Sequence, residues 1–301
     1  MKIINQMKKP YFYNTLLLLI SFLLILGCSN KNEKDNKIIK FPYYKTDLEE
    51  MKLRGKIKSF KEYSYKAIDS FGVISKGKKQ HIDGFEAYPE GVFLTFNTEG
   101  FFKESTEYTV YEKINEKIIY SYNQKGQKIE QNVYDSINKF DYKVVFKYNE
   151  KGYLFDRSLY DEKGKLNKKF VFENNENDNE IKESLYSSKG NLDSYYKYKY
   201  DNKGNLIETS FIDYGRLVIS ENTIYIYDVK GNLILKNSSI TIKEGTVDIE
   251  TNYTYNTLGD IESIDSTTYE YIYDSNNNWI KRIEYNSGFP KFVLERKIEY
   301  Y

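Results

Sequence analysis

The sequence contains one cysteine, one histidine, one tryptophan and four prolines in 301 residues. Because Cys28 is the only cysteine, no disulfide can form within the chain. His81 has no second histidine and no nearby cysteine to join it, so we interpret it as a surface or packing residue. The chain also lacks the G-x-S-x-G motif of serine hydrolases. We therefore expect no metal site, no cofactor and no catalytic residue of these common types.

Neither sign of charge dominates the sequence. The full chain has 45 basic and 44 acidic residues. If residues 1–27 are removed, three lysines and no acids are lost, which leaves 42 basic and 44 acidic residues and a net charge of minus two. A nucleic-acid partner is not expected for this balance.

The only long apolar run, residues 16–26, follows the basic residues Lys2, Lys8 and Lys9. Its length is about half of the roughly 20 residues that a membrane-spanning helix needs. A basic start, a short apolar core and then Gly27-Cys28 are typical of a secretory signal peptide. We therefore predict that residues 1–27 are removed, with cleavage between Gly27 and Cys28.

The segment Ile25-Leu26-Gly27-Cys28 resembles the bacterial lipobox, although Leu26 is larger than the usual residue at its position. The resemblance implies that Cys28 receives a lipid and anchors the protein in a membrane of the cell envelope. Ser29 after the cysteine is compatible with the outer membrane in a cell that has one. The alternative is an ordinary cleavage site with an unused thiol. Residues 28–44 are mostly polar and charged, so we predict a flexible tether before a domain at 45–301.

Turn residues recur at a fixed period along the domain. The markers are Gly100, Gly126, Gly152, Asp178, Gly204, Gly231 and Gly259, so the intervals are 26, 26, 26, 26, 27 and 28 residues. A second set lies about midway between them, at Asn138, Gly164, Gly190 and Gly215. Each unit of about 26 residues therefore contains two strands and two turns.

Most of these turns share one formula, in which Asn or Asp is followed by two residues and then Gly, as in NQKG at 123 and DNKG at 201. The Asx side chain caps a type I turn, and the glycine supplies the left-handed conformation of a bulged hairpin. Apart from one possible helical turn at 47–51, we predict strands from about Lys56 onward.

Aromatic and apolar residues occupy alternate positions before many of these turns, as in Tyr196, Tyr198 and Tyr200, with Lys197 and Lys199 between them. Period two places one set on each face of a sheet. The pattern predicts an all-β fold, an extended antiparallel meander of tandem hairpins. It should twist and curl to cover its aromatic face partly, with terminal strands protecting the edges.

The segments Tyr200–Glu208 (YDNKGNLIE) and Tyr227–Leu233 (YDVKGNL) resemble YD repeats of the RHS type. The resemblance covers about residues 92–285, and degenerate strands extend it to about 56–301. Known RHS arrays are much longer and form shells around a toxin domain, so only the hairpin architecture is implied here. Residues 160–166 resemble MORN-type repeats more loosely, which implies nearly the same meander.

Two turns, 175–179 and 274–278, are rich in oxygen ligands but lack the glycine and the acidic residue of an EF-hand, so we interpret both as structural. We expect the recurring tyrosines to form the core rather than a binding surface, and Trp279 to cap the last hairpin. Two functions remain open. One is a non-catalytic envelope lipoprotein that binds protein or glycan, and the other is a hydrolase of envelope polymer that uses paired carboxylates. We favour the first, without a known ligand-binding residue.

Overall fold

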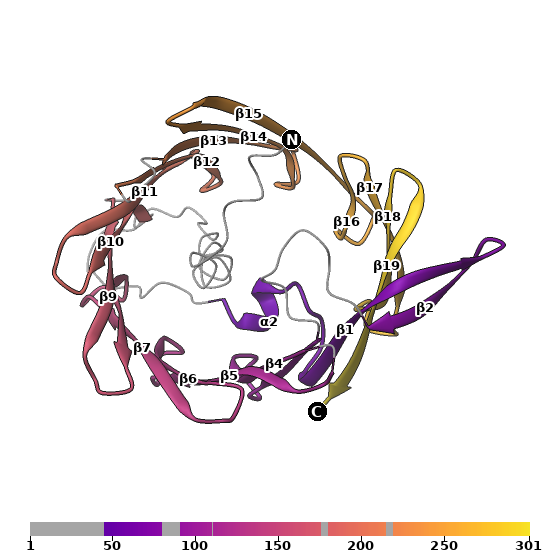
Figure 1. Ribbon diagram of the computed structural model, residues 1–301, viewed down its shortest axis with the longest axis horizontal. Helices are drawn as coiled ribbons and strands as arrows, with labels where there is room; N and C mark the ends of the chain where they lie inside the picture. The colour runs from indigo at the N-terminus through magenta and orange to yellow at the C-terminus, as the bar shows by residue number, and fades with distance from the viewer. Residues whose placement is uncertain (1–44, 80–90, 110, 176–179, 215–218) are drawn as a thin grey trace, which may run out of the picture.

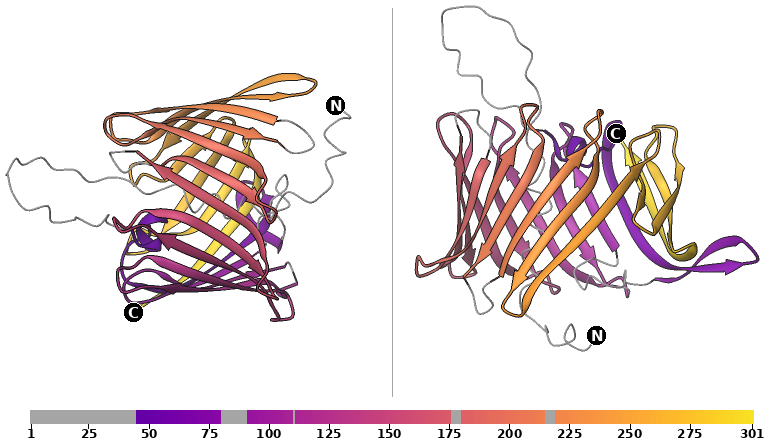
Figure 2. Two further views of the ribbon diagram at one scale, coloured as in Figure 1. Left: turned by 90° about the vertical axis from the view of Figure 1, so that its left-hand side faces the viewer. Right: turned by 90° about the horizontal axis from the view of Figure 1, so that it is seen from above.

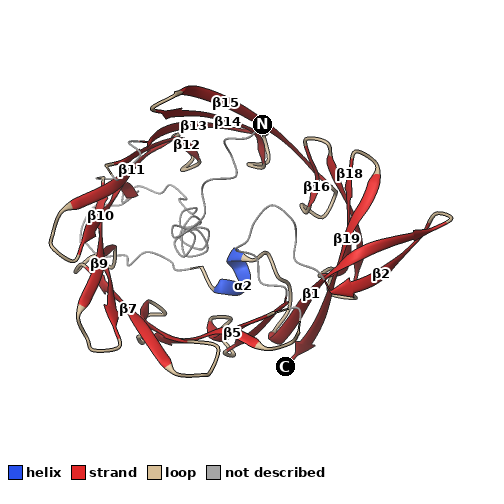
Figure 3. Cartoon of the chain, viewed as in Figure 1, coloured by secondary structure: helices blue, strands red, loops and turns tan. Residues whose placement is uncertain are grey.

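The computed structural model describes residues 45–79, 91–109, 111–175, 180–214 and 219–301. Within these ranges the chain forms nineteen strands and one short helix, α2 (Asp47–Glu50). Figure 3 shows the helix in blue and the strands in red. The predicted signal peptide and tether, with Gly27 and Cys28, lie outside the described residues, and so does His81. In the described part of the chain, no helix is long and apolar enough to cross a membrane.

The strands follow one another along the whole domain. The first ten are β1 (Ile57–Ser70), β2 (Val73–Lys79), β3 (Gly91–Phe96), β4 (Phe102–Tyr108), β5 (Ile114–Tyr122), β6 (Lys128–Tyr134), β7 (Phe140–Tyr148), β8 (Leu154–Asp161), β9 (Leu166–Asn174) and β10 (Glu180–Ser187). The others are β11 (Leu192–Tyr200), β12 (Leu206–Asp213), β13 (Ile219–Tyr227), β14 (Leu233–Ile242), β15 (Gly245–Tyr255), β16 (Ile261–Ile264), β17 (Thr267–Tyr273), β18 (Trp279–Asn286) and β19 (Phe289–Tyr300).

All strand pairs are antiparallel, and from β3 to β19 each strand pairs with the next, which confirms the predicted meander. The sheet curls further than the predicted partial covering of its aromatic face, because its terminal strands β1 and β19 pair with each other. This pairing runs from Ile57–Tyr300 to Lys66–Phe292. β1 also pairs with β3, so eighteen strands close into a barrel and only β2 extends from its wall. Figures 1 and 2 show this ring and its inclined strands.

The described turns have the predicted geometry, whereas the predicted turn positions Asp178 and Gly215 lie outside the described residues. In the turn at 123–127, the Asn123 carboxamide oxygen accepts hydrogen bonds from the N–H groups of Lys125 and Gln127 at 2.9 and 3.1 Å. Gly126 has φ +76°, the left-handed conformation that the formula requires. The register then shifts beyond the first pair, Tyr122–Lys128, so each such hairpin carries a bulge near its turn. The Asx turns that lead from an odd into an even strand, such as those at 97–100, 123–126 and 201–204, lie at one end of the barrel, here named the Asx rim. The Asx turns at 135–138 and 161–164 lead from an even into an odd strand and lie at the other end.

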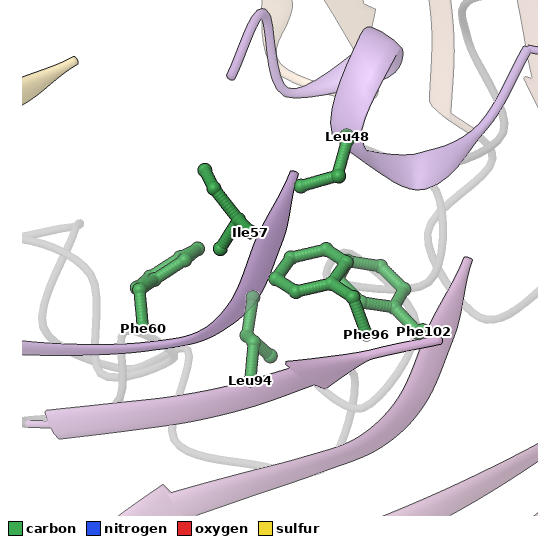
Figure 4. Close-up of a cluster of buried hydrophobic side chains, with 6 residues drawn as sticks. All are labelled: Leu48, Ile57, Phe60, Leu94, Phe96 and Phe102. Carbon is green, nitrogen blue, oxygen red and sulfur yellow. The ribbon is translucent and has the colours of Figure 1, made fainter. Parts of the chain in front are cut away.

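The helix α2 lies within the ring in Figure 1 and is held at the Asx rim. Its Asp47 carboxylate accepts hydrogen bonds from the Phe102 N–H at 2.7 Å and the Tyr122 hydroxyl at 3.0 Å. Leu48 packs into the main apolar cluster beside it, as Figure 4 shows. The buried members of this cluster are Leu48, Ile57, Phe60, Leu94, Phe96 and Phe102. The helical turn predicted at 47–51 is therefore confirmed, and it fixes the start of the domain against the inner wall.

Candidate functional site on the inner wall

The two faces of the barrel wall differ in chemistry. Because α2 lies inside the ring, the residues that it packs against, such as Phe96 and Phe102, face inward. Residues that pair across neighbouring strands lie on the same face of the sheet. The strand pairings therefore show which residues of each strand face the inside of the barrel. One series of such paired residues, from β1 and β3 to β7, is Phe60, Leu94, Ser105, Ile118, Val133 and Tyr142. The aromatic face is therefore the inside of the barrel.

The outer face carries ion pairs between neighbouring strands. Their N···O distances are 3.0 Å for Lys117–Glu104, 3.7 Å for Lys143–Glu130, 3.0 Å for Lys169–Asp156, 2.8 Å for Lys182–Glu173 and 2.7 Å for Lys199–Glu208. Of the two lysines that alternate with Tyr196, Tyr198 and Tyr200, Lys199 thus has a carboxylate partner, whereas the Lys197 ammonium lies 5.5 Å from the Tyr195 ring centroid. The predicted division into an aromatic face and a wetter face is confirmed.

The recurring tyrosines tie one repeat to the preceding one, a role that the sequence pattern did not indicate. The hydroxyl of Tyr148 donates to the backbone carbonyl of Lys128 at 2.8 Å. Tyr227 donates in the same way to Leu206 at 2.8 Å, and Tyr255 donates to Leu233 at 2.9 Å. In each case the acceptor lies two residues after the preceding turn glycine, so these are equivalent bonds. The rings themselves are only half-buried, which leaves part of each one accessible inside the barrel.

Three of the described arginines point into the barrel, and two of them are paired with glutamates. Arg157 binds Glu183 at 2.8 Å, and Arg296 binds Glu62 at 2.5 Å. Arg282 forms no ion pair and no hydrogen bond with any described residue, and its buried Nε has no partner. Its guanidinium lies 5.1 Å from the Tyr269 ring centroid and 5.3 Å from that of Trp279. Among these three arginines, Arg282 is the one without an ion-pair partner in the described part of the chain.

The wall around Arg282 is built by β17, β18 and β19. Tyr269, Tyr271 and Tyr273 follow one another along the inner face of β17, with centroid separations of 6.5 and 5.8 Å. Trp279 meets Tyr271 edge to face at 6.2 Å and packs with Phe292 and Leu294. Trp279 is 8% exposed, in a buried cluster at the last Asx turn, so it fixes this part of the wall rather than offering an open ring face.

The Arg157–Glu183 pair is the most buried charged group of the inner wall. The Glu183 carboxylate also accepts a hydrogen bond from the Tyr198 hydroxyl at 3.1 Å, so both of its oxygens have partners. Burial, and then the charge of Glu183, raises the pKa of Glu180 to about 8. A carboxyl that stays protonated at neutral pH is a candidate general acid. Its partner acid Glu183, however, is fully engaged by Arg157 and Tyr198.

A second pair of inner-wall acids, Glu107 and Glu116, lies directly opposite across β4 and β5. Burial and the charge of Glu107 raise the pKa of Glu116 to about 7, and burial also raises the pKa of Glu107. No described cation forms an ion pair with either residue. These two carboxyl groups are the closest match to the paired carboxylates of the hydrolase hypothesis.

A cavity of about 390 Å³ opens at the Asx rim between α2 and the turn at 97–100. Its acids are Glu49 and Glu99, and the Glu49 carboxylate already accepts a hydrogen bond from the Thr46 N–H at 2.7 Å. This cavity brings together no charged groups comparable to those of the inner wall.

The oxygen-rich turn at 274–278 has a structural role, as predicted. The Asp274 carboxylate accepts from the N–H groups of Asn276 and Asn278, both at 2.9 Å. The Asn278 side chain exchanges two hydrogen bonds with the backbone of Arg54, at 2.8 and 2.7 Å, and so joins the start of the domain to its end. Of the turn at 175–179, only Asn175 belongs to the described residues. Across the described ranges, no group of three His, Cys, Asp or Glu side chains is placed to hold a metal ion.

No protein-family model matches the sequence, and no curated protein matches it. Among solved structures, a porin-like protein from Bacteroides uniformis ATCC 8492 is 11% identical with a TM-score of 0.42, and the match covers 81% of this chain and 98% of that one. The TcdB2-TccC3-Cdc42 structure matches 77% of this chain at 12% identity and a TM-score of 0.35. The Photorhabdus luminescens Tc holotoxin pore matches 67% at 16% identity and a TM-score of 0.26. This chain spans only 14% of the matched chain in each of the two toxin structures.

Proposed function

We propose that this protein is a non-catalytic lipoprotein of the cell envelope whose barrel binds a glycan through its inner wall. The observation that carries the proposal is the half-buried tyrosine face inside a closed barrel, with the unpaired Arg282 beside it. Tyrosine rings combine rigid apolar area with a polar tip, which suits stacking on sugar rings. A protein segment is the other class of ligand for such a wall.

The anchor in this proposal is a lipid on Cys28, and the barrel wall stands in water. The outer ion-pair ladders support this arrangement, because a charged side chain on a lipid-facing barrel wall costs about 2–4 kcal/mol at the bilayer midplane. The described chain begins beside the Asx rim, where Leu48 N–H donates to the Gly100 carbonyl at 3.1 Å. We therefore expect the Asx rim to be the end of the barrel nearest to the anchor. In a cell with two membranes, the outer membrane is the expected location.

We also propose that the hairpins are YD repeats of the RHS type. The support is the tandem formula in residues 200–208 and 227–233, and the equivalent tyrosine bonds of successive repeats.

The competing function is a hydrolase of envelope polymer, with Glu107 and Glu116 or Glu180 as the acids. The specific observation in its favour is the raised pKa of Glu116 and of Glu180. Against it, both carboxylate oxygens of Glu183 already have partners. The pKa values of Glu107 and Glu116 are both raised, so neither side chain is stabilised in its ionised form.

The anchor is tested by expressing the full chain with and without Cys28→Ala and following mass and detergent partition. We expect a lipid-sized mass increase and detergent partition that the substitution abolishes. A water-soluble product of unchanged mass from both chains would contradict the anchor.

Binding and hydrolysis are separated by incubating the protein with envelope polysaccharides and measuring both bound protein and new reducing ends. We expect retention on the polysaccharide without new reducing ends. Release of reducing ends that Glu116→Gln or Glu180→Gln abolishes would favour the hydrolase.

A further inference from the structure

We propose that Arg282 forms an oxyanion subsite on the inner wall, which selects a saccharide carrying carboxylate or sulfate groups over a neutral one. This inference rests on the proposed glycan-binding function and names the class of glycan. It also assigns the residue that would distinguish an acidic from a neutral chain.

Arg282 differs from the other two described arginines that face the inside of the barrel. Glu183 and Glu62 neutralise Arg157 and Arg296, at 2.8 and 2.5 Å. Arg282 has no equivalent partner among the described residues, and its Nε is buried without a hydrogen bond. Leaving a buried charged donor unsatisfied costs free energy, so such a group in a native structure calls for a ligand or a solvent partner.

Aromatic side chains hold the Arg282 guanidinium in place. Its carbon lies 5.1 Å from the Tyr269 ring centroid and 5.3 Å from that of Trp279. Trp279 is itself fixed by Arg296, whose guanidinium lies 3.3 Å from the indole centroid on the inner wall. Aromatic rings hold a guanidinium in place without neutralising its charge. Arg282 is therefore positioned in advance for an incoming anion.

One acid on the same face, Glu284, could compete for this cation. Glu284 lies two residues further along β18, so it is on the same face, but it forms no ion pair with any described cation. Burial raises the pKa of Glu284, although the charge of Arg282 partly opposes this effect. Burial thus weakens the negative charge of this acid in the free protein.

An aromatic surface continues from Arg282 along the inner wall. The tyrosines of β17 form a row next to it, with ring centroids 6.5 and 5.8 Å apart, and all three rings are partly exposed. A row of rings offers stacking to several sugar units, while the guanidinium fork matches the two oxygens of a carboxylate or sulfate group. The two kinds of contact together fit an acidic oligosaccharide.

The experiment is a fluorescence titration of the full chain, purified in detergent, because its single tryptophan adjoins Arg282. The probes are oligogalacturonate, its fully methyl-esterified form, which has the same rings without charge, and a sulfated oligosaccharide. The variants are Arg282→Gln and Arg282→Lys. The control is Lys281→Gln, which removes a cation from the neighbouring outer-face position opposite Ile272.

We expect an acidic probe to bind the native chain at least about 10-fold more tightly than the methyl ester, because one charge-assisted contact is worth about that factor. Arg282→Gln should remove this preference, Arg282→Lys should reduce it, and Lys281→Gln should leave it unchanged. The carboxylated and sulfated probes show which oxyanion is preferred. Melting curves of the variants confirm that each one is folded, and Arg282→Lys keeps the test valid if Arg282→Gln does not fold.

The results separate this inference from the function on which it rests. Equal binding of the acidic and neutral probes by the native chain would overturn the subsite but keep glycan binding. The subsite would also be overturned if Arg282→Gln kept the preference for the acidic probe, or if Lys281→Gln abolished that preference as well. Binding of no probe would contradict both this inference and the glycan-binding function for these sugar backbones.

Discussion

Tyr227 illustrates how a tyrosine-rich sequence builds this wall. Its ring belongs to the aromatic face, while its hydroxyl donates to the Leu206 carbonyl of the preceding repeat at 2.8 Å. Burial raises the pKa of this hydroxyl to about 12, so it remains a donor throughout the physiological range. Phenylalanine would supply the same apolar area but not this bond between repeats, which explains the use of tyrosine at the equivalent positions.

Tyr227→Phe should therefore destabilise the barrel by about 1 kcal/mol, the usual net value of one hydrogen bond. The matched control is Tyr195→Phe on the outer face, whose hydroxyl has no described partner and whose loss should change stability by less. Urea unfolding followed by circular dichroism gives the midpoints. Equal midpoints for both variants would show that the inner hydroxyl adds nothing.

Glu116 gives a prediction on pH dependence. Its pKa is raised from 4.5 to about 7 by burial and by Glu107, so the folded state holds its proton more tightly than the unfolded state. The stability from this group is present in full below about pH 4.5 and is lost as the pH rises toward 7, by up to about 3 kcal/mol. Glu180, with a pKa of about 8, acts in the same direction.

We expect the melting temperature to fall between pH 5 and pH 8 and Glu116→Gln to reduce this fall. Glu262→Gln, at an exposed position, should leave the pH profile unchanged. Melting curves at both pH values, recorded at constant ionic strength, measure the difference. A native melting temperature that rises over this interval would contradict the assignment.

At the scale of the element, the sequence predicted the hairpins and not their closure. The Asx-x-x-Gly formula indicates a turn through local hydrogen bonds and a positive φ, which depend only on neighbouring residues. The alternation of side chains along each strand is also local, so the repeats and their two faces were predictable. Arg157 and Glu183 are one repeat, or 26 positions, apart, and nothing local to either residue specifies the pair. The same holds for Arg282, which is distinguished only by the partner that it lacks.

Two turn glycines allow local strain to be separated from packing. Gly126 and Gly164 have φ +76° and +77°, so alanine meets the same backbone cost at both. A Cβ at Gly126 would lie 2.9 Å from the Phe101 ring, whereas nothing lies within 4 Å at Gly164. Gly164→Ala should cost about 1 kcal/mol and Gly126→Ala should cost more. Chemical denaturation of both variants measures the difference, and equal losses would mean that Phe101 moves away freely.

At the scale of the whole molecule, the barrel depends on the seam between β1 and β19. This seam joins the two ends of the domain and has no counterpart among the repeat contacts. Further bonds fix both ends of the domain to other parts of the barrel, because Arg54 donates to the Leu258 carbonyl at 2.9 Å and the Tyr301 hydroxyl donates to the Phe96 carbonyl at 2.7 Å. An open meander would leave two long unpaired edges, which favour aggregation. Closure therefore protects the fold as well as enclosing its aromatic face.

A disulfide across the seam tests this closure. Lys61 and Lys297 are direct partners on the outer face, so a Lys61→Cys, Lys297→Cys chain in a Cys28→Ala background should oxidise readily. The resulting loop contains most of the domain and should stabilise it by up to about 5 kcal/mol. A Lys61→Cys, Lys147→Cys chain is the control, because β1 and β7 are not neighbours. Faster migration on non-reducing gels and a higher unfolding midpoint for the seam pair alone would support closure. Failure of the seam pair to form a disulfide would mean that β1 and β19 do not meet and that the meander is open in solution.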